Sequence, residues 1–337
     1  MDIVLYLKNL QGRGVQKVYL NLAKGLQELE CSVHFVIREN YVELDNSFLE
    51  HFYIFEQNIT SQLDKLLNQL DKALLIANDV ATTLKLKNIE SKNIYYTVHM
   101  LWGERIFKQF RFKKWFELKR LYKDKQIIAV SEEVKEDLLN KVKIKPKSIR
   151  VIPDCFDIEL IQTLAQETID FQDEYILNIG ALSREKNQKL LIESYAQLNS
   201  SFDLVILGEG KLRNSLEKLT FKLNISEKVH FLGFKSNPYS YIKNAKLLVA
   251  TSSNEALPGV VIESLILDTP VVSTDSLGVR SILKRNLSSF IVSKSQDLSD
   301  KIYQALEDYP TIKTKDYKIF SYKNIARQYM NSIEREK

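Results

Sequence analysis

Cysteine and long apolar runs are both scarce in this chain of 337 residues. Its two cysteines, Cys31 and Cys155, are too few and too far apart for a disulfide framework or a thiolate metal site, and they fit a reducing compartment. No apolar run approaches the roughly 18 residues needed to cross a bilayer. Asp2 and Lys8 bracket the first apolar run too closely for a signal peptide. We therefore expect a cytoplasmic protein, with peripheral attachment to the inner face of the cytoplasmic membrane left open.

Two phosphate-related motifs are also missing. No G-x-x-x-x-G-K-[ST] occurs, which argues against a P-loop NTPase. No D-x-D occurs either, and two aspartates at that spacing are a usual way to hold a divalent ion on a diphosphate. His34, His51 and His230 show no metal-ligand spacing. We therefore predict no metal site and no required cofactor, so that any bound phosphate meets Lys, Arg and helix N-termini.

What the chain does contain is an alternation of short apolar runs with amphipathic helical patterns. This alternation predicts α/β domains with parallel sheets, and the length favours two domains. We predict a first Rossmann-like domain over residues 1–165, a second over 166–318, and a terminal helix over 319–337 that returns to the first domain. The first domain opens with a strand, the loop Gly12-Arg13-Gly14 and a helix, the order found in nucleotide-type domains, although a plain turn explains the glycines equally well.

Basic charge gathers in residues 104–125. This segment holds nine Lys or Arg against three acids, while the whole chain carries a net charge of +5. Helical spacing places Phe107, Phe110, Leu118, Leu121 and Tyr122 near one face. A core helix with a solvated basic side and an interfacial helix on an anionic membrane both fit, whereas no nucleic-acid recognition motif accompanies the segment. The candidate membrane or acceptor patch comprises Arg105, Lys108, Arg111, Lys113, Lys114 and Trp115.

The stretch 246–275, KLLVATSSNEALPGVVIESLILDTPVVSTD, reads as strand, loop, helix and strand. Pro258 stands where a first helical turn begins, and a helix N-terminus offers free N–H groups to an anion. Glu255 in the loop and Glu263 in the helix are carboxylates suited to binding hydroxyls. This combination of an anion site and hydroxyl acceptors suggests a nucleotide sugar.

Three more candidates follow predicted strands. His99 stands directly after the strand 93–98, at the carboxyl end where open α/β sheets bind ligands, although a lone histidine is often structural. Arg184 and Lys186 follow the strand that ends at Gly180. They could neutralise a pyrophosphate, and a solvated basic loop is the alternative.

Several segments, in order, resemble the retaining glycosyltransferases of family 4, which have the GT-B architecture of two Rossmann-like domains with parallel sheets facing a deep cleft. In the second half these are NIGALSREKNQKLLIESY, LVILGEGKLRNSLEKL, VHFLGF and the stretch 246–275 with its E-x7-E pair. TVHMLWG, AVSEEVKEDL and VIPDCFD carry the resemblance in the first half.

The resemblance implies transfer of a hexose or N-acetylhexosamine, most simply from a UDP-sugar, to a surface glycan or lipid-linked acceptor such as lipopolysaccharide or capsule. It implies catalytic roles for His99, Lys186 and Glu255, with Glu263 on the ribose diol. The further donor-binding residues that it implies are Gly12, Gly14, Arg184, Gly208, Glu209, Phe234, Leu257, Pro258, Gly259 and Val260.

Some positions depart from the family pattern. Ala181, Ala256 and Asp268 replace residues that are usually arginine or glycine, and Asp154 stands where asparagine is usual. Two alternatives therefore stay open, a nucleotide-sugar-binding protein with weak catalysis and a sugar epimerase of the same fold.

Overall fold

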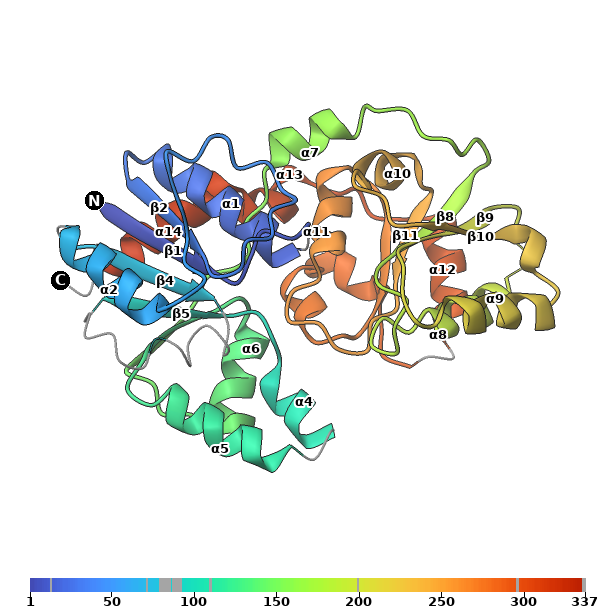
Figure 1. Ribbon diagram of the computed structural model, residues 1–337. Helices are drawn as coiled ribbons and strands as arrows, with labels where there is room; N and C mark the ends of the chain where they lie inside the picture. The colour runs from blue at the N-terminus through green and yellow to red at the C-terminus, as the bar shows by residue number, and fades with distance from the viewer. Residues whose placement is uncertain are drawn as a thin grey trace. The chain divides into compact units, whose positions relative to one another are not determined.

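The chain forms two compact units in the computed structural model (Figure 1), which describes residues 1–12, 14–70, 72–78, 86, 93–108, 111–198, 200–294 and 297–334. The first unit comprises Met1–Phe156 together with Phe320–Lys337, and the second comprises Asp157–Ile319. The last segment of the chain therefore belongs to the same unit as the first.

A seven-stranded sheet with the order β3-β2-β1-β4-β5-β6-β7 forms the centre of the first unit, and every pairing in it is parallel. Its strands are β1 (Asp2–Leu7), β2 (Ser32–Ile37), β3 (His51–Ile54), β4 (Leu74–Asn78), β5 (Ile94–Val98), β6 (Gln126–Ala129) and β7 (Ser148–Val151). Most side chains of β1, β4 and β5 are buried whichever way they point, because a parallel sheet is covered on both faces. This explains the continuous apolar runs of the sequence.

The helices of the first unit are α1 (Gly14–Gln27), α2 (Ile59–Gln69), α4 (Trp102–Lys108), α5 (Phe112–Leu121), α6 (Glu132–Glu136) and α14 (Tyr322–Glu334), and a π-helical turn covers Asp137–Val142. Helix α1 buries Tyr19, Leu22, Ala23 and Leu26, which recur at helical spacing. Helix α14 packs closely on α1, since a side chain at Gly25 would come within 2.7 Å of the Tyr322 carbonyl oxygen.

The second unit contains a six-stranded parallel sheet with the order β10-β9-β8-β11-β12-β13. Its strands are β8 (Tyr175–Ile179), β9 (Asp203–Leu207), β10 (Val229–Gly233), β11 (Leu247–Ala250), β12 (Val271–Thr274) and β13 (Ile291–Val292). The predicted α/β class with two parallel sheets is confirmed. Strand β13 has only two residues, which is too short for a recognisable pattern, and the sequence did not predict it.

The helices of the second unit are α7 (Ile158–Leu164), α8 (Gln188–Tyr195), α9 (Arg213–Lys222), α10 (Tyr239–Asn244), α11 (Gly259–Ile266), α12 (Leu298–Glu307) and α13 (Thr314–Tyr317). Helix α7 begins where the Asp157 carboxylate accepts the Leu160 N–H at 3.1 Å, an N-cap, and it packs on α10 and α11. Within the described part of the chain, no helix combines the length and apolarity that a membrane span needs.

Candidate active site

The candidate site of the second unit lies where the strand order reverses. Strand β8 has β9 on one side and β11 on the other, so the loops that follow β8 and β11 leave neighbouring strands at the same edge. Such a reversal is where open α/β sheets bind their ligands. Lys186 comes from the first of these loops and Glu255 from the second.

The loop after β8 holds Lys186 against the β11 side. The Thr251 hydroxyl donates to the Lys186 carbonyl oxygen at 2.9 Å, and the Ser253 N–H donates to the Glu185 carbonyl oxygen at 2.8 Å. The Lys186 side chain crosses Gly180, where a methyl group would stand 3.2 Å from its Cδ. The loop after β11 therefore fixes the backbone position of Lys186.

Glu255 receives two donors on a single oxygen. The Lys186 ammonium group forms an ion pair with Oε1, and the Ser252 hydroxyl donates to the same atom at 2.8 Å. Among the described residues, no donor reaches Oε2. The Glu255 side chain is 19% exposed, so one carboxylate oxygen is held by the protein while the other is available to a ligand.

Helix α11 places Glu263 beyond this pair. The sequence placed Pro258 at the start of the first helical turn, and in the structure Pro258 is the N-cap of α11, one residue before the helix. Gly259 and Val260 therefore begin the helix with N–H groups that have no partner within it. Glu263 is half-buried one turn further on. Burial, and to a lesser degree the Glu263 carboxylate, raises the pKa of Tyr239.

Glycines bring the strand ends of this edge into contact. Gly208 has a φ of +135°, and a Cβ there would stand 2.1 Å from the Gly180 carbonyl oxygen, so no other residue fits.

The other predicted donor-binding side chains differ in exposure. Glu209 pairs with Arg213 at 2.9 Å, and Phe234 is 68% exposed. Leu257 is buried and Arg184 is exposed.

His99 lies in the first unit, at the end of β5. Its Nδ1 is 3.0 Å from Asp154 Oδ1, without the alignment of a hydrogen bond, and its Nε2 is 3.3 Å from the Thr97 hydroxyl. That hydroxyl lies 2.5 Å from the Tyr19 hydroxyl in the core. Both ring nitrogens therefore face groups of the same unit, which the sequence spacing gave no means of predicting.

The two loop glycines of the first unit have open surroundings. The Gly12 N–H donates to Glu43 Oε2 at 2.8 Å, and a Cβ on Gly12 would make only ordinary contact with that atom. Gly14 begins α1, and a Cβ there would meet nothing within 4 Å. Gly12 has no positive φ, and no described neighbour requires glycine at either position. Arg13 between them lies outside the described residues.

The predicted single helical face in residues 104–125 is wrong. The segment forms two helices, α4 and α5, and Phe107 is 45% exposed, whereas Leu118, Leu121 and Tyr122 are buried as expected. Phe110 lies outside the described residues. Arg111, which precedes α5, is not helical, with φ −90° and ψ 58°, so spacing counted from α4 to α5 does not define a shared face.

Exposed aromatic and basic side chains nevertheless gather on these helices. Phe107, Phe112 and Phe116 are exposed, as are Arg111 and Lys113. Around them, Lys114 pairs with Glu117 at 3.0 Å, Lys119 lies over the Trp115 ring, and Arg105 donates to Met100 Sδ; the Lys108 side chain lies outside the described part. We call Phe107, Phe112 and Phe116 together with the basic residues described around them the aromatic–basic surface. These basic residues are Arg105, Arg111, Lys113, Lys114 and Lys119.

A buried carboxylate holds the start of α4, one of the two helices that carry this surface. Asp137 accepts the Gly103 N–H at 2.6 Å and the Glu104 N–H at 3.2 Å, both from the first turn of α4. Burial raises the pKa of Asp137, while these two hydrogen bonds oppose that rise. A Cβ at Gly103 would stand 2.5 Å from Lys141 Cβ, so glycine permits the close approach.

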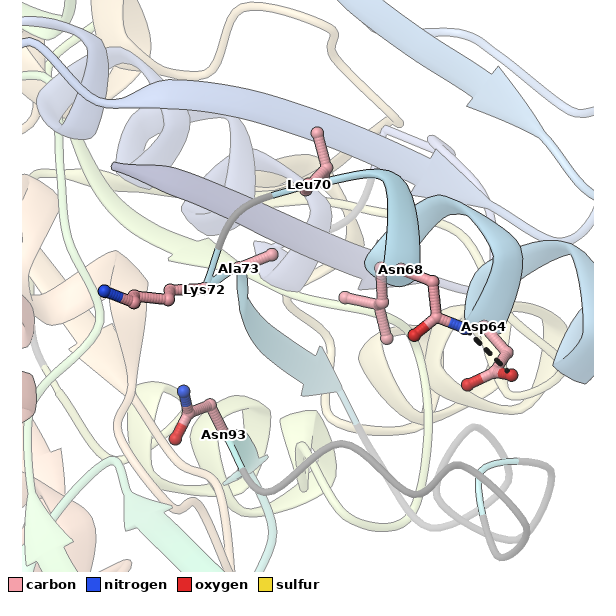
Figure 2. A pocket seen from close by; sticks show the side chains of 7 residues that line it. Asp64, Asn68, Leu70, Lys72, Ala73 and Asn93 are labelled. Carbon is pink, nitrogen blue, oxygen red and sulfur yellow. Dashed lines mark hydrogen bonds between the residues drawn. The ribbon is translucent and has the colours of Figure 1, made fainter.

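A hollow of about 260 Å³ lies elsewhere in the first unit (Figure 2). Asp64 and Asn68 of α2 line it together with Lys72, Ala73 and Asn93, which precede β4 and β5. It is therefore at the amino ends of these strands, the opposite edge from His99, and contains no predicted site residue. Within the described residues, no three His, Cys, Asp or Glu side chains are arranged to hold a metal ion.

Two family models match the chain, one in each half. The model described as Glycosyltransferase Family 4 matches residues 12–160, and the model described as Glycosyl transferases group 1 matches residues 162–325. Together they extend over all of the predicted site and over both sheets except strand β1.

Among curated proteins, the chain is 35% identical over 203 residues to a Campylobacter jejuni enzyme named N-acetylgalactosamine-N,N'-diacetylbacillosaminyl-diphospho-undecaprenol 4-alpha-N-acetylgalactosaminyltransferase. It is 31% identical over 248 residues to an uncharacterized glycosyltransferase of Methanocaldococcus jannaschii. These matches include 60% and 65% of this chain and span 54% and 61% of the two relatives.

Among solved structures, Anabaena HepE in complex with UDP and glucose superposes with a TM-score of 0.82 over 99% of both chains, at 18% sequence identity. At that identity the likeness concerns the fold alone. Together with the two parallel sheets and the two family matches, it confirms the predicted GT-B fold.

Proposed function

The chain belongs, by its fold and by the family matches of both its halves, to the GT-B glycosyltransferases, and from that membership we propose that it transfers a hexose or N-acetylhexosamine from a nucleotide sugar to a glycan or glycolipid acceptor. The observation that carries this proposal is the convergence of Lys186 and Glu255 at the strand-order reversal, followed by the free N–H groups of α11. A cation, an available carboxylate oxygen and a helix N-terminus are together suited to a sugar diphosphate.

The diphosphate is assigned to Lys186, Arg184 and the start of α11 at Leu257–Val260. On donor binding, the Lys186 ammonium group leaves Glu255 and pairs with a phosphate oxygen. The Glu263 carboxylate accepts hydrogen bonds from the two ribose hydroxyls. Gly208, Glu209 and Phe234 would lie beside the base. We propose UDP as the nucleotide, because HepE was solved with UDP and the Campylobacter relative is named for an N-acetylgalactosaminyl transfer.

In the proposed reaction the bond between the anomeric carbon and the diphosphate breaks, and an acceptor hydroxyl attacks the same face, with retention, and gives its proton to the departing diphosphate oxygen. Negative charge grows on the departing diphosphate, so the fixed cation Lys186 stabilises the transition state more than the ground state. The charge is met by Lys186 without a required metal ion. Glu255 holds hydroxyls of the transferred sugar, and the catalytic role of His99 stays a prediction.

A lipid-linked acceptor fits the aromatic–basic surface. Three exposed phenylalanines among basic side chains suit the headgroup region of an anionic membrane. The name of the Campylobacter relative includes a diphospho-undecaprenol acceptor. We therefore propose peripheral attachment to the inner face of the cytoplasmic membrane and an acceptor carried by a lipid diphosphate.

A panel of UDP-, GDP- and ADP-sugars tests this function by thermal shift and by nucleotide release with and without a lipid-linked acceptor. We expect one donor to stabilise the protein and to release its nucleotide faster with acceptor present. Binding without release would instead support the nucleotide-sugar-binding alternative, and epimerised donor would support the epimerase.

A further inference from the structure

A strained turn stands directly behind Glu255. Leu277 has φ 67° and ψ −69°, and the Gly278 N–H donates to the Ser276 carbonyl oxygen at 3.0 Å. These are the features of a γ-turn with a positive φ at its centre, which is rare and strained for a residue that carries a side chain. Backbone strain of this kind persists only where hydrogen bonds and packing from neighbouring residues enforce the conformation.

The surroundings that hold this turn are the backbone of Glu255. Its N–H donates to the Ser276 carbonyl oxygen at 3.0 Å, and its carbonyl oxygen accepts the Gly278 N–H at 3.0 Å. Gly278 is buried, and a Cβ there would stand 2.2 Å from the Ala256 carbonyl oxygen and 2.6 Å from that of Glu255. Only glycine allows the two segments to approach this closely.

The side chain of Glu255 is held separately, by Ser252. The Ser252 hydroxyl donates to Oε1 at 2.8 Å, and Ser252 itself is 7% exposed. Its own carbonyl oxygen accepts the Thr274 hydroxyl at 2.8 Å. Lys186 is the other partner of Oε1 and, in the proposed reaction, turns to the diphosphate. The Ser252 hydroxyl is then the donor that still holds Glu255 Oε1.

We propose that Ser252 and the Ser276–Gly278 turn are positioning elements that keep Glu255 in its reactive orientation when Lys186 engages the donor. This inference rests on the proposed function. The turn fixes the Glu255 backbone from behind, and the Ser252 hydroxyl fixes Oε1, so Oε2 meets the transferred sugar without a search among rotamers.

Kinetics of Ser252→Ala test the side-chain half of the proposal. We expect kcat to fall about tenfold or more, with the Kd for free UDP within twofold of wild type, because UDP lacks the sugar that Glu255 holds. Ser252→Thr, which keeps the hydroxyl, should recover most of kcat. Ser273→Ala removes a hydroxyl that is also buried in this unit and donates only to Thr274, and should change neither quantity.

A double-mutant cycle separates positioning from general damage. In a Glu255→Ala background, adding Ser252→Ala should change kcat less than twofold, since the group that Ser252 orients is gone. A full additional loss would overturn the proposal. So would a Ser252→Ala enzyme with wild-type kcat. If the wild-type protein turns over none of the nucleotide sugars, the proposed function fails first, and the outcome is distinguishable from both.

Thermal unfolding tests the turn independently of activity. Ala normally stabilises relative to Gly, but at a strained positive φ the order reverses. We therefore expect Leu277→Gly to melt about 2 °C or more above Leu277→Ala, whereas the usual order would refute the strained turn. Gly278→Ala should lower kcat in a protein that still unfolds cooperatively, and unchanged kcat would overturn the backbone half of the proposal.

Discussion

Replacing Gly208 with alanine tests the contact on which the donor-side edge of the second sheet depends. The added Cβ would stand 2.1 Å from the Gly180 carbonyl oxygen and 2.8 Å from the carbonyl carbon, where nothing flexible can yield. The φ of +135° adds backbone strain that a side chain does not tolerate. Steric overlap and strain of this kind each cost about 1–3 kcal/mol, so we expect a loss of about 3 kcal/mol.

Thermal unfolding followed by circular dichroism measures this loss. For a domain of this size, about 3 kcal/mol corresponds to a fall in Tm of about 6 °C or more. Gly14→Ala is the stability control, because a Cβ at this helix start meets no atom within 4 Å, and it should leave Tm unchanged or raise it. UDP affinity should fall with Gly208→Ala, since displacement of Gly180 moves the loop of Lys186. A Gly208→Ala protein that melts within 1 °C of wild type, measured to about that precision, would refute the reasoning.

Three further changes probe other parts of the chain. Lys186→Ala should weaken UDP binding about tenfold or more by calorimetry, because a charge-assisted contact is lost, whereas exposed Lys189→Ala should not; equal affinities would contradict the assignment. Phe116→Ser should reduce sedimentation with anionic liposomes at low salt, while Phe221→Ser, at an even more exposed position in the second unit, should not, and a wild-type protein that ignores such liposomes would remove the membrane role. Asp137→Ala should lower Tm by several degrees, since two N–H groups of α4 lose their acceptor at about 1–3 kcal/mol; an unchanged melt would show that this carboxylate does not hold α4.

Much of the fold could be predicted because apolar runs and helical periods are local signals. The apolar pattern predicts a first strand over Asp2–Leu7, as observed for β1, and a helix over Val260–Leu267, one residue later at each end than α11. The order of loops after β8 and β11 then placed Lys186 and Glu255 at one edge, because carboxyl ends of parallel strands coincide.

What could not be predicted depends on contacts between distant residues. Asp137 caps a helix 34 residues away, and neither segment carries a pattern that names the other. The positive φ of Leu277 arises from hydrogen bonds to Glu255, so its own residue type gives no signal of it. The division of residues 104–125 into α4 and α5 could not be predicted, because both helices have helix-forming residues and no proline or glycine separates them.

The most direct test of the central claim is the anomeric configuration of the product. With the best UDP-sugar and a lipid-linked acceptor, proton NMR of the new glycosidic bond should show the configuration of the donor. Glu255→Gln and Lys186→Ala should each reduce the rate about a hundredfold or more while the proteins remain folded. An inverted product, or variants that transfer sugar at the wild-type rate, would contradict the account.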